Sequence, residues 1–286
     1  MPKVNGPTIP RWQLGDELGR RREAAGLTTA EVAEKLDCSE SKIKKIEAGY
    51  VGVIKAELMV MFDLYNIEDE RSRSSLMELQ KLGKQRGWWS QFGRVPNSFG
   101  TFLGLESSAT SIRIFEPLMV HGLLQTEEHA TALESTITPG SGPEQVERQV
   151  KIRLARQDRV FRGDEPPDVW VVLDEAVLRR MVGGADVMRR QLEHLRAMTD
   201  RLTLQVVPFS HGGYPGAFGA FTIFDFDDEI RSPVVYVEGQ AGGLYLERAV
   251  DLQRCNVAYS HLTAAALSPP ESAKLITAAI RELKSG

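Results

Sequence analysis

The residues between positions 39 and 45 carry side chains that suit contact with a nucleic acid. Lysine ammonium groups attract phosphates, whereas hydroxyl and carboxylate groups can hydrogen-bond to base edges in the major groove. The chain places such side chains close together at Ser39, Glu40, Ser41, Lys42, Lys44 and Lys45. Because one short helix can present all of them, we expect this segment to be the binding surface of the N-terminal region.

Two helix starts bracket this segment. Thr28 and Glu31 have the spacing of a capping box, which predicts a helix over residues 28–36. After a short turn, Ser39 is a suitable cap for a second helix, which Gly49 ends. Ser39 and the amides of that first turn also suit a phosphate.

The second helix has two distinct faces. Ile43 and Ile46 form a buried edge, so Ser41, Lys44 and Lys45 lie on the opposite side at 100° per residue. Two helices of this length joined by a tight turn have the dimensions of a helix-turn-helix, whose second helix enters the major groove. The alternative is an amphipathic hairpin with a solvated lysine face, and helix geometry alone leaves both interpretations open.

Glu40 is an unusual residue at the tip of a helix that contacts DNA. Its carboxylate repels phosphates but can accept a hydrogen bond from the N4 amino group of cytosine. The alternative is that Glu40 only favours the N-terminal end of the helix dipole.

The string RREAAGLTTAEVAEKLDCSESKIKKIEAG, residues 21–49, resembles the xenobiotic-response-element (Cro/C1-type) helix-turn-helix family without a gap. The resemblance implies that Thr29, beside Thr28 at the start of the first motif helix, contacts DNA. It also implies that bases are read by Glu40, Ser41 and Lys45, with Lys42 placed for contact with the phosphate backbone.

The same resemblance implies a structural ion pair between Arg22 and Glu47. Two positions depart from the family pattern, because Asp37 replaces the usual turn glycine and Cys38 replaces a small apolar residue. We expect Cys38 to be a packing residue, as free cysteines commonly are.

Composition restricts the class of protein. The 286 residues suffice for two domains, and 42% hydrophobic with 26% charged residues is typical of a globular protein. The net charge of −4 means that DNA binding must come from a local patch. The short apolar runs and two cysteines predict a reduced, cytoplasmic protein that does not enter a membrane.

The apolar pattern changes along the chain. Residues 1–86 predict an all-α domain of five helices, and residues 87–111 predict a connecting segment that is partly helical. Residues 112–286 predict a larger α+β domain with a mixed sheet of about five strands and C-terminal helices. The predicted strands are 112–116, 169–174, 202–207, 217–225 and 233–238, and the predicted helices are 126–135, 144–162, 175–198 and 247–284.

The C-terminal domain offers two groups of candidate ligand- or partner-binding residues. Three aromatic residues of a glycine-rich loop, together with Trp170 of a predicted strand, could line a small-molecule pocket, or the loop aromatics could pack on the core: Phe209, Tyr214 and Phe218. Three arginines of the helix 144–162 could face an acidic partner or DNA, or they could form a solvated face: Arg148, Arg156 and Arg159.

Enzymatic chemistry has little support. Asp174, Asp225 and Glu238 lie at or near strand ends, where carboxylates can bind a metal, but no lysine accompanies them at a useful spacing. The five histidines show no zinc-binding pattern, and no phosphate-binding glycine motif occurs. We therefore predict no catalytic residue, no metal and no cofactor.

The rest of the chain resembles the domain of unknown function of WhiJ-type, antitoxin-like regulators of actinomycete bacteria. His121-Gly122 departs from a usual Pro-Gly. The resemblance implies a transcriptional regulator, generally a repressor, with a small companion protein encoded by a neighbouring gene. A homodimer is expected because one helix-turn-helix covers one half-site. The segments that carry the resemblance are 122–133, 153–160, 166–184, 205–226, 234–247 and 265–276.

Overall fold

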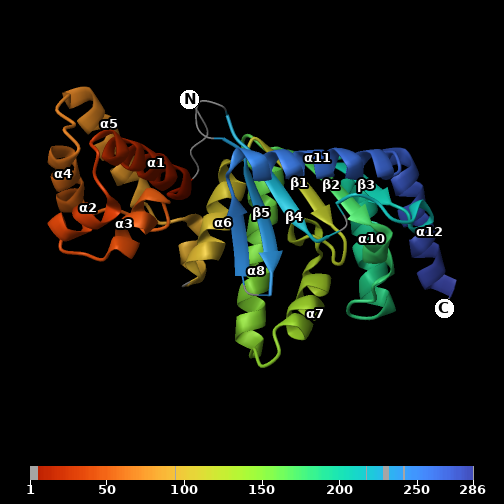
Figure 1. The fold of residues 1–286 in the computed structure, drawn as a ribbon. Coiled ribbons are helices and arrows are strands. Elements are labelled where there is room, and N and C mark those ends of the chain that lie inside the picture. Colours follow the sequence, from red (N-terminus) through yellow and green to blue (C-terminus); the bar gives the residue numbers. More distant parts are fainter. Residues whose placement is uncertain (1–5, 94, 217, 228–231, 241, 286) are drawn as a thin grey trace. The chain divides into compact units, whose positions relative to one another are not determined.

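A computed structural model of the chain describes residues 6–93, 95–216, 218–227, 232–240 and 242–285. These residues form two compact units: the first ends at Ser108 and also includes Asp227, and the second begins at Ala109. The first unit is helical and the second contains a sheet with helices (Figure 1). This confirms the predicted fold class of a helical N-terminal region followed by an α+β domain.

The first unit contains the five predicted helices and two further helical segments. Leucine, isoleucine and valine at helical spacing form one core, to which each of the first five helices contributes a buried residue: Leu18, Val32, Ile43, Phe62 and Leu76. The elements are α1 (Thr8–Ala24), α2 (Thr29–Lys35), α3 (Glu40–Glu47), α4 (Lys55–Leu64), α5 (Glu70–Gly83), η1 (Trp88–Phe92) and α6 (Asn97–Ser108).

The second unit is built on a six-stranded mixed sheet in the order β3-β2-β1-β4-β5-β6. The first three strands in the chain run parallel, and the other pairings are antiparallel. The strands are β1 (Ser111–Glu116), β2 (Asp168–Asp174), β3 (Thr203–Val207), β4 (Phe221–Asp225), β5 (Val234–Gly239) and β6 (Gly242–Leu246).

Two details of the sheet differ from the prediction. β6 was not predicted, because its two glycines weaken the strand signal. β4 begins at Phe221, not at 217, and residue 217 lies outside the described part of the chain.

Helices surround the sheet. Tyr259 and Leu262 of α11 pack against strand residues such as Phe115 and Val235 and so cover one face of the sheet (Figure 1). The predicted helix 175–198 is two helices, because Gly183 and Gly184 adopt positive φ angles of 73° and 86°. The helical segments are η2 (Gly122–Leu124), α7 (Glu127–Ile137), α8 (Pro143–Arg162), α9 (Glu175–Arg179), α10 (Ala185–Met198), η3 (Phe209–His211), α11 (Ala249–Ala265) and α12 (Pro269–Ser285).

None of the helices that the structure describes is long and apolar enough to cross a membrane.

Candidate nucleic-acid interface

Side-chain caps fix the starts of α2 and α3. The Glu31 amide donates to Thr28 Oγ1 over 3.2 Å, and the Thr28 amide donates to Glu31 Oε2 over 2.8 Å. The Lys42 amide donates to Ser39 Oγ over 3.3 Å. Each cap satisfies amides that the first helical turn leaves unpaired, so both helices begin where the sequence indicates.

The turn between α2 and α3 contains a residue in the left-handed region. Asp37 has a φ of 49° in the place where the resembling family has glycine. Aspartate tolerates this conformation better than most residues, which explains how the turn forms without glycine. Cys38 is half-buried and packs against the core, as its position in the turn requires.

The outer face of α3 is exposed and its inner face is buried. Ile43 and Ile46 are 0% and 2% exposed and anchor the helix on the core. The exposed side chains are those expected to meet DNA: Ser39, Glu40, Ser41, Lys44 and Lys45. Thr29 is half-buried at the start of α2, and its Oγ1 donates to Glu40 Oε1 over 2.8 Å. The structure therefore brings together the N-terminal ends of both motif helices.

Two of the three lysines of α3 have carboxylate partners. Lys44 Nζ lies 2.6 Å from Glu40 Oε1, and this hydrogen bond, followed by the one from Thr29, lowers the pKa of Glu40. Lys42 Nζ lies 2.5 Å from Glu57 Oε1 of α4, and this hydrogen bond raises the pKa of Lys42. Within the described residues Lys45 forms no ion pair. Its exposed ammonium group can therefore contact DNA without first breaking a bond to a carboxylate.

Glu57 was not singled out in the sequence. Its Oε2 also accepts from the Ile54 amide over 3.3 Å, so the same side chain caps α4 and holds Lys42. The signal was a glutamate three residues after the start of a helix, which is half of a capping box.

Two glycines allow α3 to lie close to α1. A Cβ atom on Gly15 would lie 2.4 Å from the carbonyl oxygen of Glu47, and one on Gly49 would lie 2.0 Å from Cδ1 of Trp12. Gly49 also has a φ of 70°. The angle and depth at which α3 presents its outer face therefore depend on these close approaches, which the sequence did not reveal.

An ion pair joins the ends of α1 and α3. Arg22 Nε donates to Glu47 Oε1 over 2.6 Å, and Arg22 Nη2 donates to Glu47 Oε2 over 3.0 Å. Arg22 Nη1 also donates to the Leu27 carbonyl over 2.8 Å. The hydrogen bond with Glu47 is the main cause that raises the pKa of Arg22. This bidentate geometry fixes the C-terminal end of α3 against the α1–α2 connection.

The geometry agrees with comparisons to known protein families. A family model described as a helix-turn-helix domain matches residues 13–74, which contain most of α1, all of α2 to α4 and the start of α5. A second, described as a domain of unknown function (DUF5753), matches residues 99–278, more than half of the chain. The chain belongs to the DUF5753 family. No curated protein and no solved structure matches the chain. The helix-turn-helix match supports a DNA-binding regulator.

Within the DUF5753 domain, the four candidate aromatic residues do not line one pocket. Tyr214 packs on Phe115 and donates its hydroxyl to Asp174 Oδ2 over 2.5 Å. Trp170 packs on Tyr259. Trp170 lies four residues before Asp174 on β2, or about 13 Å along the strand. The remaining two candidates are largely exposed, Phe209 at 57% and Phe218 at 104%.

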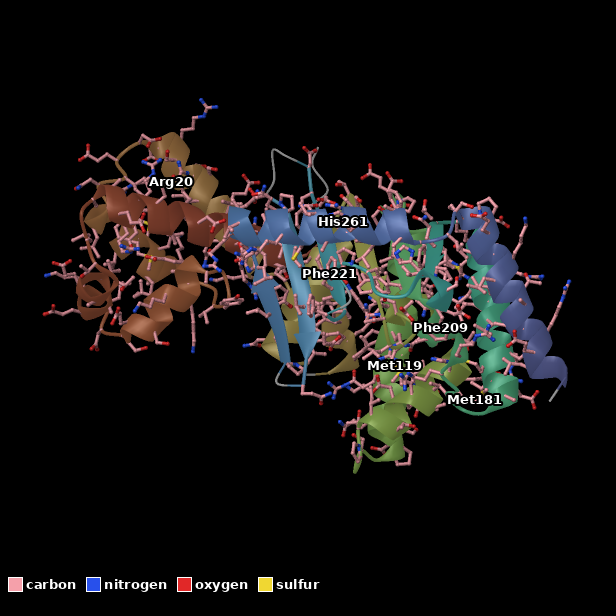
Figure 2. All side chains as sticks on the ribbon, turned by 45° about the vertical axis from the view of Figure 1, so that its right-hand side comes forward. Arg20, Met119, Met181, Phe209, Phe221 and His261 are labelled. Atoms are coloured by element: carbon pink, nitrogen blue, oxygen red, sulfur yellow. The ribbon has the colours of Figure 1, made fainter. Side chains whose placement is uncertain are left out.

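The rings on this face form a continuous row within the core. Phe115 contacts Phe221, and Phe221 contacts Tyr259. Figure 2 shows Phe221 in the sheet below α11, which carries His261, and Phe209 away from that row toward the loops. Tyr214 and Trp170 therefore belong to opposite ends of one packed row of rings.

The predicted arginine face of α8 needs a correction. Arg156 is only 6% exposed, because it lies four residues from Ile152 and from Val160, both of which are buried. Arg148 is half-buried, and Arg159 is exposed as expected. The three arginines therefore do not form one surface for an acidic partner.

A buried polar group that was not predicted lies at α8. Arg153 Nη1 donates to Gln125 Oε1 over 2.6 Å, and Arg153 Nη2 pairs with Glu134. Burial, followed by the charges of Arg156 and Arg153, lowers the pKa of His121 to about 3. Gln125 in turn donates to the Val120 carbonyl, so this group holds the segment between β1 and α7 in place.

The three carboxylates considered for a metal site have separate roles. Asp174 caps α9 by accepting from the Ala176 amide, and Asp225 forms a bidentate pair with Arg113 at 3.0 Å for both bonds. Glu238 is exposed at the end of β5. Among the residues that the structure describes, no group of three or more potential ligands is placed to hold a metal ion.

Glu116, at the end of β1, should make stability depend on pH. Burial, followed by the charge of Glu238, raises the pKa of Glu116 from 4.5 to about 8. In the unfolded chain the carboxyl loses its proton at lower pH, so stability falls as pH rises from about 4.5 to about 8. Replacing Glu116 with glutamine removes this loss. We expect the substitution to be more favourable at pH 9 than at pH 5, measured by urea unfolding.

The matched control is Glu144→Gln, which changes an exposed glutamate of α8 in the same unit. An equal effect of Glu116→Gln at both pH values would show that Glu116 ionises normally in the folded protein.

Proposed function

We propose that the protein is a sequence-specific transcriptional regulator that inserts α3 into the major groove of DNA. The observation that carries this proposal is the exposed face of Ser41, Lys44 and Lys45, backed by buried Ile43 and Ile46, within a helix-turn-helix match. A rigid short helix with cationic and small polar side chains on one side has the shape and charge for that groove.

The individual side chains have different proposed roles. Ser41 and Lys45 read bases, because they lie on the exposed side of α3 away from its anchor. Lys42 and Lys44 exchange their carboxylate partners for DNA phosphates. The first turns of the two helices, with Thr28 and Ser39 as caps, supply amides for phosphate contact at their positive ends.

Glu40 has a further role in this proposal. Its carboxylate is ionised and is held between Thr29 and Lys44, at the end of α3 that meets base edges. An acceptor fixed in this place favours the N4 amino group of cytosine. The hydrogen bond from Thr29 supports this role, because it fixes the position of the carboxylate between the N-terminal ends of the two motif helices.

Lys45→Ala is the substitution that tests this function. We expect binding to the selected operator to weaken by about 1–3 kcal/mol, since a base contact is lost. Binding to random DNA should change little. The measurement is a gel-shift titration of full-length protein on an operator obtained by selection from a random pool and on a scrambled duplex.

The two duplexes separate the possible outcomes. An equal loss on both would assign Lys45 to the phosphate backbone. If the wild-type chain enriches no sequence from the pool, the proposal of a sequence-specific regulator fails.

The proposal extends to regulation by partners. The resemblance to WhiJ-type regulators supports a repressor that acts in the cytoplasm, whose C-terminal domain senses a small companion protein encoded by a neighbouring gene. Two half-sites call for a homodimer. Co-purification of the neighbouring gene product with the full chain, and its effect on the gel shift, test the companion.

A further inference from the structure

The two edge strands of the sheet, β3 and β6, differ in whether another segment hydrogen-bonds to their outer side. At the β3 edge, the Val206 carbonyl accepts from the Leu267 amide over 2.9 Å, and the Val206 amide donates to Ser272 Oγ over 2.9 Å. The connection between α11 and α12 therefore covers this edge. At the other edge, β6 pairs only with β5 among the strands that the structure describes.

β6 lacks the charged and proline residues that commonly protect an edge strand. Its sequence, Gly-Gly-Leu-Tyr-Leu, contains no charge and no proline, and Leu244 at its centre is 59% exposed. Edge strands of monomeric proteins commonly carry a lysine, a proline or a bulge, because an unprotected edge pairs with another chain.

The register with β5 shows how β6 is oriented. Gly239 and Gly242 face each other at the closed end of the hairpin, and Val237 faces Leu244. Residues of an antiparallel strand alternate between bonding to the neighbour and directing their backbone groups to the other side. In a hairpin with a two-residue loop the pair next to the loop is hydrogen-bonded, so this alternation assigns Gly242 and Leu244 to bonding with β5 and directs the N–H and C=O of Gly243 toward the edge.

We propose that β6 pairs antiparallel with β6 of a second copy of this chain, about a two-fold axis at Leu244. The two sheets then form one continuous sheet, with both α11 helices on the same face. Leu244 lies directly opposite the Leu244 of the copy, and Gly242 lies opposite its Leu246. This pairing gives the proposed homodimer an interface. The inference therefore rests on the proposed function, which includes the homodimer.

The charges around β6 favour a second copy over another protein. In a symmetric pair, any charged residue at the centre of the strand would face the same charge, and β6 has none. Arg248, just after β6, would lie opposite the neutral Gln240 of the copy. A strand that pairs with itself must avoid like charges in this way, whereas a strand for a different partner need not.

The test uses opposite charges at Leu244 in the full-length chain. Leu244→Glu and Leu244→Lys each place like charges face to face, so we expect each variant to dimerise about a hundredfold more weakly than wild type. An equimolar mixture of the two should recover the dimer. Sedimentation velocity over a concentration series measures the mass, and circular dichroism confirms that each variant is folded.

Val257→Glu is the matched control, since Val257 is 51% exposed on α11 in the same unit. It should remain dimeric. A dimer that persists in Leu244→Glu overturns the assigned surface but leaves the homodimer standing, and a monomeric wild type overturns both. Retained binding of Leu244→Glu to a single half-site shows that the DNA-binding function is separate from either result.

Discussion

Gly49→Ala is expected to destabilise the helical unit by about 2–5 kcal/mol. A left-handed backbone costs a residue with a side chain about 1–2 kcal/mol, and an overpacked contact costs about 1–3 kcal/mol more. Both apply here, because Gly49 has a φ of 70° and its Cβ would lie 2.0 Å from Cδ1 of Trp12 and 2.8 Å from its Cα. The contact with the Cα atom of Trp12 can be relieved only by moving the backbone of α1 relative to the end of α3. A loss of this size is a large part of the total stability of a small domain.

Gly26→Ala provides a closely matched control. Gly26 has a φ of 71°, almost the same as that of Gly49, but nothing lies within 4 Å of its added Cβ. Only the backbone cost of about 1–2 kcal/mol is therefore expected there. Urea unfolding followed by circular dichroism measures both variants. Equal losses would mean that the close approach to Trp12 contributes nothing to the position of α3.

Replacing Lys42, Lys44 and Lys45 together with alanine is expected to lower operator affinity about a thousandfold. Lys45 contributes a base contact, and the other two lysines contribute phosphate contacts. The plot of log K against log salt should become less steep by about 2, since each lost phosphate contact removes about 0.9. Gel shifts or fluorescence anisotropy at several salt concentrations measure both quantities.

The control removes the same amount of charge elsewhere in the first unit. Arg71, Lys81 and Lys84 are exposed on α5 and at its C-terminal end. Their triple alanine variant should keep most of the affinity and the slope. If both triple variants lose affinity equally, net charge governs binding, and the result contradicts the assignment of α3 as the helix that contacts DNA.

Local signals in the sequence predicted the motif well. The caps of α2 and α3, the end of α3 and the buried isoleucines all depend on residues within one or two helical turns of each other. Such contacts follow from helix geometry and capping chemistry, which act over short distances in the chain.

Features that depend on distant segments were missed. The sequence does not indicate that Gly15 lies against the backbone of Glu47. It also does not indicate that Glu57 forms an ion pair with Lys42. The spacing of the arginines predicts an exposed Arg156, although the buried Ile152 and Val160 on the same side of α8 turn it inward. β6 was missed because a strand with two glycines is stabilised by its pairing with β5 and has little propensity of its own.

If α3 binds DNA as proposed, the carboxylate partners of Lys42 and Lys44 influence how the protein distinguishes its operator from other DNA. Away from its operator, α3 carries two neutralised ammonium groups and one that is unopposed within the described structure. On the proposed binding mode, random duplexes compete with Glu57 and Glu40 for these cations, which reduces the free energy gained from phosphate contacts alone. In the proposed function, an operator whose bases also contact Ser41 and Lys45 offsets the loss of those pairs, so the exchange of ion pairs favours the operator over random DNA.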